Sequence, residues 1–288
     1  CYLPHRLDEG YGLSQEAVEN CLAKFPTTLL LAVDCGSTAV EPIGWLRERG
    51  VDVLVLDHHQ VSNPMPPAKA LVNPQRSSTD ELSFGELCSV GIAFKLAHAL
   101  VKRGRENGWP NAGEFDLRPL LDLVALGTIA DIVPLVRENR ILVSAGLEKL
   151  NNTRRPGLLA LKSVAQTPAP IGVYEVGFQL GPRLNAAGRL ENAVKALDLL
   201  LAQNEATALP LARELDMQNR ERQQIERGIT EQVLGAVRAK FDPAADYVIV
   251  EGGLLWHVGV VGIVASRVLR EFYRPPLIGG GEGDEWRG

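Results

Sequence analysis

A carboxylate and two imidazoles stand side by side in the sequence LVLDHHQ, where Asp57, His58 and His59 end an apolar run. Asp34 closes an earlier apolar run, TTLLLAVDCGS, and Asp131 lies within a third apolar stretch, LGTIADIVPL. Two carboxylates and an imidazole form a ligand mixture that suits Mn²⁺ and, less selectively, Mg²⁺. We therefore expect Asp34, His58 and Asp131 to form a site for a divalent metal ion.

Each of these residues also has an ordinary structural alternative. Asp34 can cap a helix, His58 can be a core imidazole, and Asp131 can be a buried, hydrogen-bonded carboxylate. Asp57 is either a further ligand or a residue that orients an imidazole. Because adjacent side chains of an extended chain point to opposite sides, we expect one of His58 and His59 to bind metal and the other to face substrate. The combination, rather than any single residue, favours a metal site, and His59 is then expected to contact a phosphoryl oxygen.

The elements around these residues indicate how they are positioned. TTLLLAVDCGS and VDVLVLDHH are short continuous apolar runs, typical of fully buried strands, and TAVEPIGWLRERG between them is expected to be a helix. Strand, helix, strand is a βαβ unit with parallel strands and a right-handed crossover. Ligands bind beyond the carboxyl ends of such strands, which is where Asp34 and Asp57 lie. The sequence therefore brings distant polar residues to one edge of a sheet.

Two further segments suit a substrate that contains phosphate. GPRLNAAGRL holds Arg183, Asn185 and Arg189 among small residues, and the guanidinium fork of arginine matches phosphate oxygens. WHVGVVGIVASR places Trp256 and His257 just before a helix whose N-terminus can receive an anion. The alternatives are solvated arginines in a capping loop and, for the Trp-His pair, packing without chemistry.

Composition limits the class of protein. The chain has 288 residues, 45% of them hydrophobic, which is enough for a substantial core in one large and one small domain. The net charge of −5 argues against a basic coat for duplex nucleic acid and leaves room for a local basic groove. No apolar run approaches the ~20 residues of a membrane helix, so we expect a cytoplasmic protein without membrane contact. The cysteines lack metal-like spacing and are expected to be inert thiols: Cys1, Cys21, Cys35 and Cys88.

A long, charge-rich helical pattern runs from Asn204 to Phe241, with no strong break after Pro210. We interpret it as the connection between two domains. Strand and helix patterns resume in DYVIVEG and VGVVGIVASRVLREFY. The predicted fold class is α/β, with a parallel-sheet domain joined by a long helix to a smaller α/β domain.

Five ordered motifs resemble the DHH phosphoesterase superfamily: AVDCGS, LDHHQ, LGTIADIVPL, GPRLNAAGRL and WHVGVVGIVASR. The last three in order resemble its RecJ-type single-strand-specific DNA exonucleases, and the resemblance covers nearly the whole chain. It implies a DHH domain in residues 1–203, a connecting helix in 204–241 and the start of a DHHA1 domain in 242–288. A two-metal phosphodiesterase site would lie in the cleft between the domains.

By this resemblance Asp34 bridges two Mn²⁺ or Mg²⁺ ions, His58 and Asp131 hold one of them, and His59 contacts the scissile phosphate. Two metal ions ~4 Å apart can activate a water and stabilise the leaving oxygen of an in-line displacement. Single-strand preference would follow from a cleft too narrow for duplex, with stacking and backbone contacts to the strand. The implied substrate contacts are Arg183, Asn185, Trp256 and His257.

The resemblance implies an enzyme that degrades single-stranded DNA from the 5′ end in recombination and repair, with single-strand-binding protein and a helicase as candidate partners. One alternative is a phosphoesterase acting on short oligoribonucleotides or cyclic dinucleotides. Another is a non-catalytic replication or repair scaffold that kept the fold. The family's first motif, Asp-x-Asp, would lie before Cys1, and its Gly-Ser-Gly-Arg and Gly-Gly-His segments beyond Gly288. We therefore expect a fragment with little or no nuclease activity.

Overall fold

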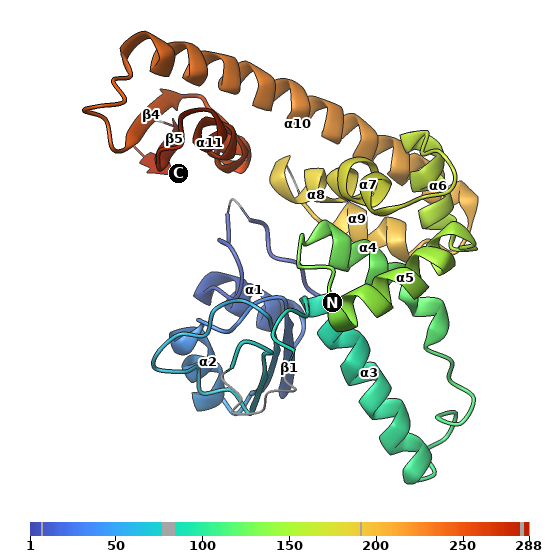
Figure 1. Ribbon diagram of the computed structural model, residues 1–288. Coiled ribbons are helices and arrows are strands. Elements are labelled where there is room, and N and C mark those ends of the chain that lie inside the picture. The colour runs from blue at the N-terminus through green and yellow to red at the C-terminus, as the bar shows by residue number, and fades with distance from the viewer. Residues whose placement is uncertain (7, 77–83, 191, 283–284, 288) are drawn as a thin grey trace.

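The computed structural model describes residues 1–288 except 7, 77–83, 191, 283–284 and 288. A small sheet with its helices lies at the lower left of Figure 1, followed by a cluster of helices. The long helix α10 then runs across the top of the view to a small sheet near the C-terminus. The chain thus forms a sheet unit, a helical unit and a C-terminal sheet unit.

Three parallel strands form the N-terminal sheet in the order β1-β2-β3. The helix α2, Val40–Glu48, makes the crossover from β1 to β2, so the predicted βαβ unit is present. Ile43 and Leu46 of α2 are fully buried and share one hydrophobic core with the strands. The other elements of this unit are α1 (Gln15–Lys24), β1 (Leu29–Val33), β2 (Asp52–Leu56) and β3 (Ala70–Val72).

The first strand departs from the prediction of a fully buried strand. Leu29, Leu31 and Val33 are 54%, 48% and 45% exposed, respectively. These alternate residues point to one face of the sheet, and that face lies open to a large cavity. β1 is also an edge strand: β2 pairs with one side, and no strand of the described residues pairs with the other. The apolar run indicated a strand correctly but not its place in the sheet.

Helices build the middle of the chain. α4 and α5 pack against each other, and α3 projects away from the rest in Figure 1. The core of this helical unit contains fully buried leucines from α5, α6, η2 and α9, namely Leu150, Leu158, Leu161, Leu180 and Leu199. The elements are α3 (Ser89–Glu106), η1 (Arg118–Leu120), α4 (Leu121–Ala130), α5 (Arg137–Asn151), α6 (Pro156–Ala165), α7 (Val173–Glu175), the π-helical turn η2 (Val176–Leu180), α8 (Gly181–Leu190) and α9 (Val194–Leu201).

A single helix, α10 (Glu205–Lys240), contributes to two hydrophobic cores. Asn204 caps its start, because the side-chain oxygen accepts a hydrogen bond from the Thr207 N–H at 2.9 Å. The helix continues through Pro210, as the sequence predicted. Its first half buries Ala208, Ala212 and Leu215 in the helical unit, and its second half buries Ile229, Val233 and Val237 under the C-terminal sheet.

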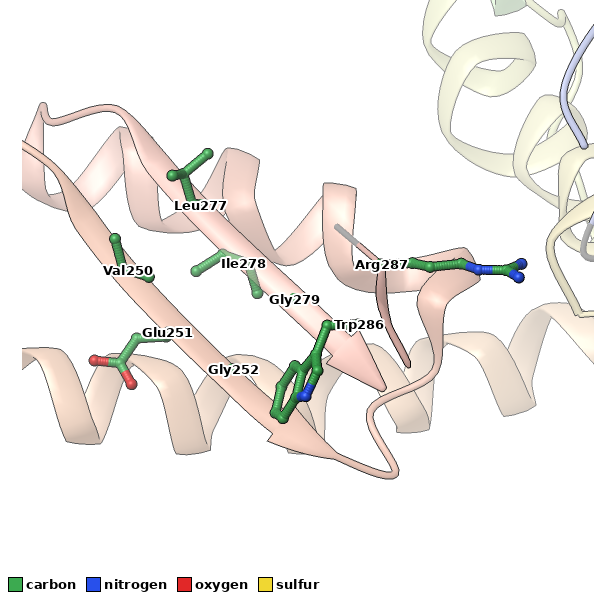
Figure 2. Close-up of a pocket in the computed structure, with 8 residues that line it drawn as sticks. All are labelled: Val250, Glu251, Gly252, Leu277, Ile278, Gly279, Trp286 and Arg287. Carbon is green, nitrogen blue, oxygen red and sulfur yellow. The ribbon is translucent and has the colours of Figure 1, made fainter. Parts of the chain in front are cut away.

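The C-terminal unit is a mixed sheet with helices on one face. β4 (Ile249–Leu254) pairs in parallel with β5 (Pro276–Glu282), and β6 (Glu285–Arg287) pairs with β5 antiparallel. α11 (Val258–Phe272) joins β4 to β5 and packs with α10 against the sheet. A hollow of about 400 Å³ lies on this sheet, and Trp286 lies close to Gly252 there. Figure 2 shows the residues that line it. Val250 and Leu277 line this hollow and are largely exposed.

This arrangement confirms the predicted class, α/β with a parallel sheet joined by a long helix to a smaller α/β unit. Within the part of the chain that the structure describes, no helix is both long and apolar enough to cross a membrane. The carboxyl ends of β1, β2 and β3 meet at one edge of the N-terminal sheet. Four of the residues expected to do chemistry, Asp34, Asp57, His58 and His59, lie at that edge.

Candidate metal centre at the carboxyl edge of the sheet

Each strand of the N-terminal sheet is followed directly by a polar residue. Asp34 follows β1, Asp57 follows β2 and Asn73 follows β3. The register aligns the last residues of the three strands, so these polar residues leave the sheet at the same edge. This edge of a parallel sheet is where α/β proteins bind ligands.

The backbone at Asp34 adopts an unusual conformation. Its φ of 64° lies in the left-handed region, which residues other than glycine rarely occupy. The Asp34 N–H donates to the carbonyl oxygen of Leu56 at 2.9 Å, so the chain stays tied to β2 while it turns away from the sheet. Such strained residues cluster at functional sites, and here the turn leaves the carboxylate 56% exposed at the sheet edge.

The imidazole of His58 lies between two carboxylates that come from distant parts of the chain. Its Nε2 is 3.5 Å from Asp34 Oδ1 and 3.3 Å from Asp131 Oδ2. Asp131 is the residue that ends α4, so the helical unit supplies one carboxylate and the sheet supplies the other. The structure therefore brings together the three residues that the sequence predicts as metal ligands.

The donor set fits a divalent ion. The side chain of His58 is 13% exposed, and its buried Nε2 has no hydrogen-bond partner among the described residues. Ligand atoms of Asp34, His58 and His59 also lie within 4.8 Å of one another. A buried polar atom without a partner is costly unless an ion or water satisfies it. Carboxylate oxygens and an imidazole nitrogen around one point suit Mn²⁺ and Mg²⁺.

Burial and charge together raise the pKa of the Asp131 carboxyl. Removal from water has the largest effect, the negative charge of Asp34 adds to it, and the imidazole of His58 opposes it. Two carboxylates facing one point repel each other when both are ionised. A cation at that point would relieve this repulsion, which is a second indication that the site is built for one.

Asp57 is held by the protein rather than free to bind a metal. Its side chain is 2% exposed and accepts hydrogen bonds from the backbone N–H groups of Ser37 at 3.0 Å and His58 at 2.8 Å. It also lies 2.7 Å from Nδ1 of His59. Burial alone raises the pKa of Asp57, but the hydrogen bonds from His59 and Ser37 outweigh it and hold the pKa below its usual range. Of the two roles that the sequence left open for Asp57, the contacts favour the orienting one.

His58 and His59 lie on the same side of the chain, and the expectation that they point to opposite sides is wrong. Their ring centroids are 4.4 Å apart. The alternation of side chains holds only in extended backbone, and residues 57–59 lie beyond the end of β2 in irregular structure. Burial lowers the pKa of His59, but its contact with Asp57 and the nearby carboxylates raise it above the usual value. His59 is 49% exposed, so its imidazole is accessible beside the metal ligands.

A cavity of about 1050 Å³ opens beside these residues. Residues 1–4 and 10–13, the exposed edge of β1 and the ends of α4 and α8 line it. Asp34 and Asp131 contribute to one part of its wall, and Asn185 and Arg189 of α8 contribute to another. Two of the predicted substrate contacts therefore share a cavity with two of the predicted metal ligands.

The other predicted substrate contacts have partners elsewhere. Arg183 pairs with Asp216 of α10 at 2.9 Å and is 15% exposed. The Trp256 Nε1–H donates to Gln232 at 2.9 Å, and Nδ1 of His257 accepts from Gly259 as the cap of α11. None of Arg183, Trp256 and His257 is among the described residues that line the cavity.

Sequence reasoning missed residues that the structure places at the site. Asn73 donates from Nδ2 to the hydroxyl of Ser37 and to the carbonyl oxygen of His59, each at 2.8 Å, and so ties the three strand ends together. The sequence feature that could have indicated Asn73 is its position directly after the short apolar run of β3. Arg6 and Tyr11 line the cavity, with the guanidinium 4.5 Å from the ring centroid. Their segment has no helix or strand pattern, so only the fold reveals their position.

Arg6 also acts on Arg189 across the cavity. Burial lowers the pKa of the Arg189 guanidinium, and the positive charges of Arg6 and Arg222 lower it further. Arg189 donates from Nη1 to the carbonyl oxygen of Gly259 at 3.2 Å. Positive side chains gathered beside a metal centre favour a substrate with several negative charges.

Comparison with known proteins places the chain in a family. Residues 1–128 match the DHH family, N-terminal domain. The matched region contains the parallel sheet and both imidazoles that follow β2. Residues 1–128 therefore form a domain of the DHH family, and the resemblance found in the motifs is confirmed.

Within this family the chain is similar to RecJ. It is 39% identical over 280 residues to the single-stranded-DNA-specific exonuclease RecJ of Bacillus subtilis (strain 168), covering 96% of this chain and 33% of the relative. It is 40% identical over 292 residues to the single-stranded-DNA-specific exonuclease RecJ of Escherichia coli (strain K12), covering 98% of this chain and 50% of the relative. The chain thus spans a third to a half of the length of these curated relatives.

Solved structures show the same likeness in three dimensions. The crystal structure of exonuclease RecJ bound to manganese matches with a TM-score of 0.81 and 37% identity, over 96% of this chain and 66% of that one. The crystal structure of RecJ from Thermus thermophilus in complex with Mg²⁺ matches with a TM-score of 0.68 and 34% identity, over 89% of this chain and 35% of that one. The fold described above is therefore that of RecJ proteins over nearly the whole chain.

Proposed function

We propose that this chain carries the metal centre of a single-strand-specific DNA exonuclease that hydrolyses phosphodiester bonds from the 5′ end in recombination and repair. The observation that carries the proposal is the buried Nε2 of His58, which lies 3.5 Å from Asp34 and 3.3 Å from Asp131. Similarity to the RecJ exonucleases supports the choice of substrate. The cavity beside the site, with arginines in its wall, supports an anionic strand.

The residues that would hold Mn²⁺ or Mg²⁺ are Asp34, His58 and Asp131. When bound, such an ion supplies positive charge that stabilises a phosphodiester under attack. The similar RecJ structures determined with manganese and with Mg²⁺ support the same ions here. The protein itself positions the three ligands. Asp34 and His58 lie just after β1 and β2 of the sheet, and Asp131 lies at the end of α4.

Asp57 and His59 are proposed to act together on the scissile phosphate. The buried carboxylate of Asp57 holds Nδ1 of His59 at 2.7 Å, which orients the imidazole beside the metal ligands. The raised pKa of His59 favours the cationic ring. A cationic, half-exposed imidazole can donate a hydrogen bond to a phosphoryl oxygen and hold a proton there.

Asn185 and Arg189 are the proposed substrate contacts that already line the cavity. Arg183, Trp256 and His257 remain proposed contacts of a looser kind. To reach a strand, Arg183 has to leave Asp216, and Trp256 has to leave Gln232. These bonds make Arg183 and Trp256 better suited to holding α8 and α11 in place than to direct binding.

The proposal extends to the organisation of the chain and its setting. We assign residues 1–203 to the DHH domain, 204–241 to the connecting helix and 242–288 to the start of a DHHA1 domain. Single-strand-binding protein and a helicase are the proposed partners, because an exonuclease of this specificity needs exposed single strands. The proposed compartment is the cytoplasm.

The test is the release of mononucleotides from 5′-phosphorylated single strands with Mn²⁺, using the longest reading frame that contains this chain. We expect single strands to be degraded far faster than duplex, and activity to be lost in Asp34→Ala and His58→Asn. Equal activity on duplex, or activity that survives either substitution, contradicts the proposal. Faster turnover of dinucleotides than of long strands would favour the short-oligonucleotide phosphoesterase, and failure to bind Mn²⁺ would favour the scaffold.

A further inference from the structure

Two aromatic side chains are exposed together on the helical unit. Tyr174 is 62% exposed and Phe178 is 69% exposed. Their ring centroids lie 4.9 Å apart, and the ring planes are inclined by 30°. Single exposed apolar residues are common, but two large rings in contact and open to solvent form a patch that indicates binding.

The pair lies close to the candidate metal centre. Phe178 belongs to the π-helical turn η2, between Gly177 and Gly181. A Cβ on Gly177 would lie 3.8 Å from the side chain of Ile129, and one on Gly181 would lie 3.3 Å from Ala130. These contacts place η2 on the last turn of α4, directly before Asp131. Short π-helical turns occur often at functional sites because they change the direction of a side chain.

The exposed rings and two residues of the cavity wall lie on one continuous helical stretch, formed by α7, η2 and α8. Phe178 follows Tyr174 by four residues, Asn185 follows Phe178 by seven, and Arg189 follows Asn185 by four. In a regular α-helix these spacings place side chains on one face, and here the π-helical turn η2 lies within the stretch. Asn185 and Arg189 line the cavity that contains Asp34. The two rings and the two cavity residues therefore belong to one continuous helical stretch, which leads from the cavity to the exposed pair.

We propose that Tyr174 and Phe178 form a stacking platform for nucleobases of a single strand whose backbone enters the cavity at Asn185 and Arg189. This inference rests on the proposed exonuclease function and adds the path of the strand outside the metal centre. Bases of a single strand are free to stack on aromatic side chains, and every base has a face that can do so. In a duplex the faces of the bases are covered by their neighbours, so the platform also contributes to single-strand preference.

The chemistry of the pair favours nucleobases over a protein segment. The two rings are largely exposed, and the helical stretch that carries them also supplies Arg189 to the cavity wall. A stacking surface combined with positive charge is typical of single-strand binding. An apolar protein segment would be expected to cover a wider hydrophobic patch than two rings. A protein partner is therefore the competing outcome of the test rather than a second proposal.

The test measures binding of a labelled short oligothymidylate to the chain by fluorescence anisotropy, without added metal so that the strand stays intact. We expect Phe178→Ala and Tyr174→Ala each to weaken binding by roughly tenfold, and Phe178→Trp to retain it. The matched control is Phe115→Ala, because Phe115 is 52% exposed in the loop that follows the projecting helix α3. All four variants should unfold at the same temperature as the wild type, since the replaced rings are exposed.

An abasic strand of the same length separates stacking from backbone contacts. We expect the abasic strand to bind the wild type and the variants equally, because it has no bases that could stack on the two rings. A fluorescent purine analogue in the strand should be quenched on binding to the wild type and not to Phe178→Ala. Equal oligothymidylate binding by wild type and Phe178→Ala refutes the platform and leaves the proposed function in place, and it would point to a protein partner for the rings. Failure of the wild type to prefer single strands over duplex contradicts the proposed function itself.

Discussion

The carbonyl oxygen of Arg189 lies directly against Gly259. A Cβ at position 259 would stand 2.1 Å from that oxygen, far inside van der Waals contact. The guanidinium of the same arginine donates back to the Gly259 carbonyl at 3.2 Å. Arg189 lies on α8 and lines the cavity beside the candidate metal centre, and Gly259 lies in the first turn of α11. This backbone contact therefore joins the C-terminal unit to the wall of the cavity.

Gly259→Ala should therefore separate the two units and destabilise the protein by about 1–3 kcal/mol, the usual effect of forcing extra atoms into a filled space. Urea unfolding measures the change. Gly262→Ala on the same helix is the matched control, because a Cβ there meets nothing within 4 Å. Alanine is the better helix former by about 1 kcal/mol, so the control should be as stable as the wild type or more so. If both variants behave alike, the contact between α8 and α11 does not matter for stability.

His58→Ala should abolish detectable Mn²⁺ binding in a calorimetric titration, because it removes the central nitrogen between Asp34 and Asp131. His98→Ala is the control, since His98 is exposed on α3. A ligand that binds only the folded state stabilises it by about 2.7 kcal/mol at a hundredfold excess over Kd. Mn²⁺ should accordingly raise the melting temperature of the wild type and of His98→Ala, and a chelator should reverse the rise. A similar rise in His58→Ala would contradict the ligand assignment.

Asp57→Asn tests the orienting role. The carboxylate of Asp57 now accepts hydrogen bonds from the backbone N–H groups of Ser37 and His58. In asparagine an NH₂ group replaces one of the two oxygens, so at least one of these buried donors loses its acceptor. We expect a loss of about 1–3 kcal/mol in the free energy of unfolding and a weakening of Mn²⁺ binding by about 10–100-fold. Asp52→Asn is the control from the start of the same strand. Among the described residues, the side chain of Asp52 forms an exposed ion pair with Lys69, worth about 0–1 kcal/mol.

Parts of the candidate site were predictable because strand ends have a simple sequence signal. An apolar run closed by a polar residue marks the point where a buried strand reaches water, and Asp34 and Asp57 lie at such points. Parallel topology then brings both to one edge. The position of Asp131 beside His58 depends on how α4 packs against the sheet, which no local pattern contains. The mixture of carboxylates and an imidazole predicted that Asp34, His58 and Asp131 lie together. The distances between their side chains come only from the fold.

Other features were out of reach of the sequence because they depend on long-range partners. Arg183 has the composition of a phosphate contact, yet its partner Asp216 lies on α10 and holds it at 2.9 Å. The edge position of β1 depends on which strands pair, and both edge and central strands can be apolar runs. His58 and His59 lie together because the chain leaves the extended conformation after Leu56, which the rule of alternating side chains does not foresee.

The N-terminal segment that lines the cavity is held by Glu9, which offers a test by titration. The Tyr2 hydroxyl donates to Glu9, and Asn20 donates to the same carboxylate at 2.8 Å. Burial and then the contact with Glu9 raise the pKa of Tyr2 to about 12. Glu9→Gln should lower this pKa toward the ordinary ~10 of tyrosine, measured by phenolate absorbance. Tyr2→Phe identifies the contribution of Tyr2 to the titration, and an unchanged high-pH step in Glu9→Gln would contradict the contact.

The same carboxylate should make stability depend on acid. Hydrogen bonds from Tyr2, His5 and Asn20 hold the pKa of Glu9 below its usual value, so the folded state favours the ionised form. Its stabilising contribution is complete above the pKa of an unfolded glutamate, about 4.3, and is lost as the pH falls through the lower folded pKa. Glu9→Gln has no proton to gain there, so the difference in unfolding free energy between wild type and variant should shrink as the solution is acidified. A difference that stays constant from neutral pH to below 4.3 would show that Glu9 is not ionised in this contact, and that the segment lining the cavity is held by other bonds.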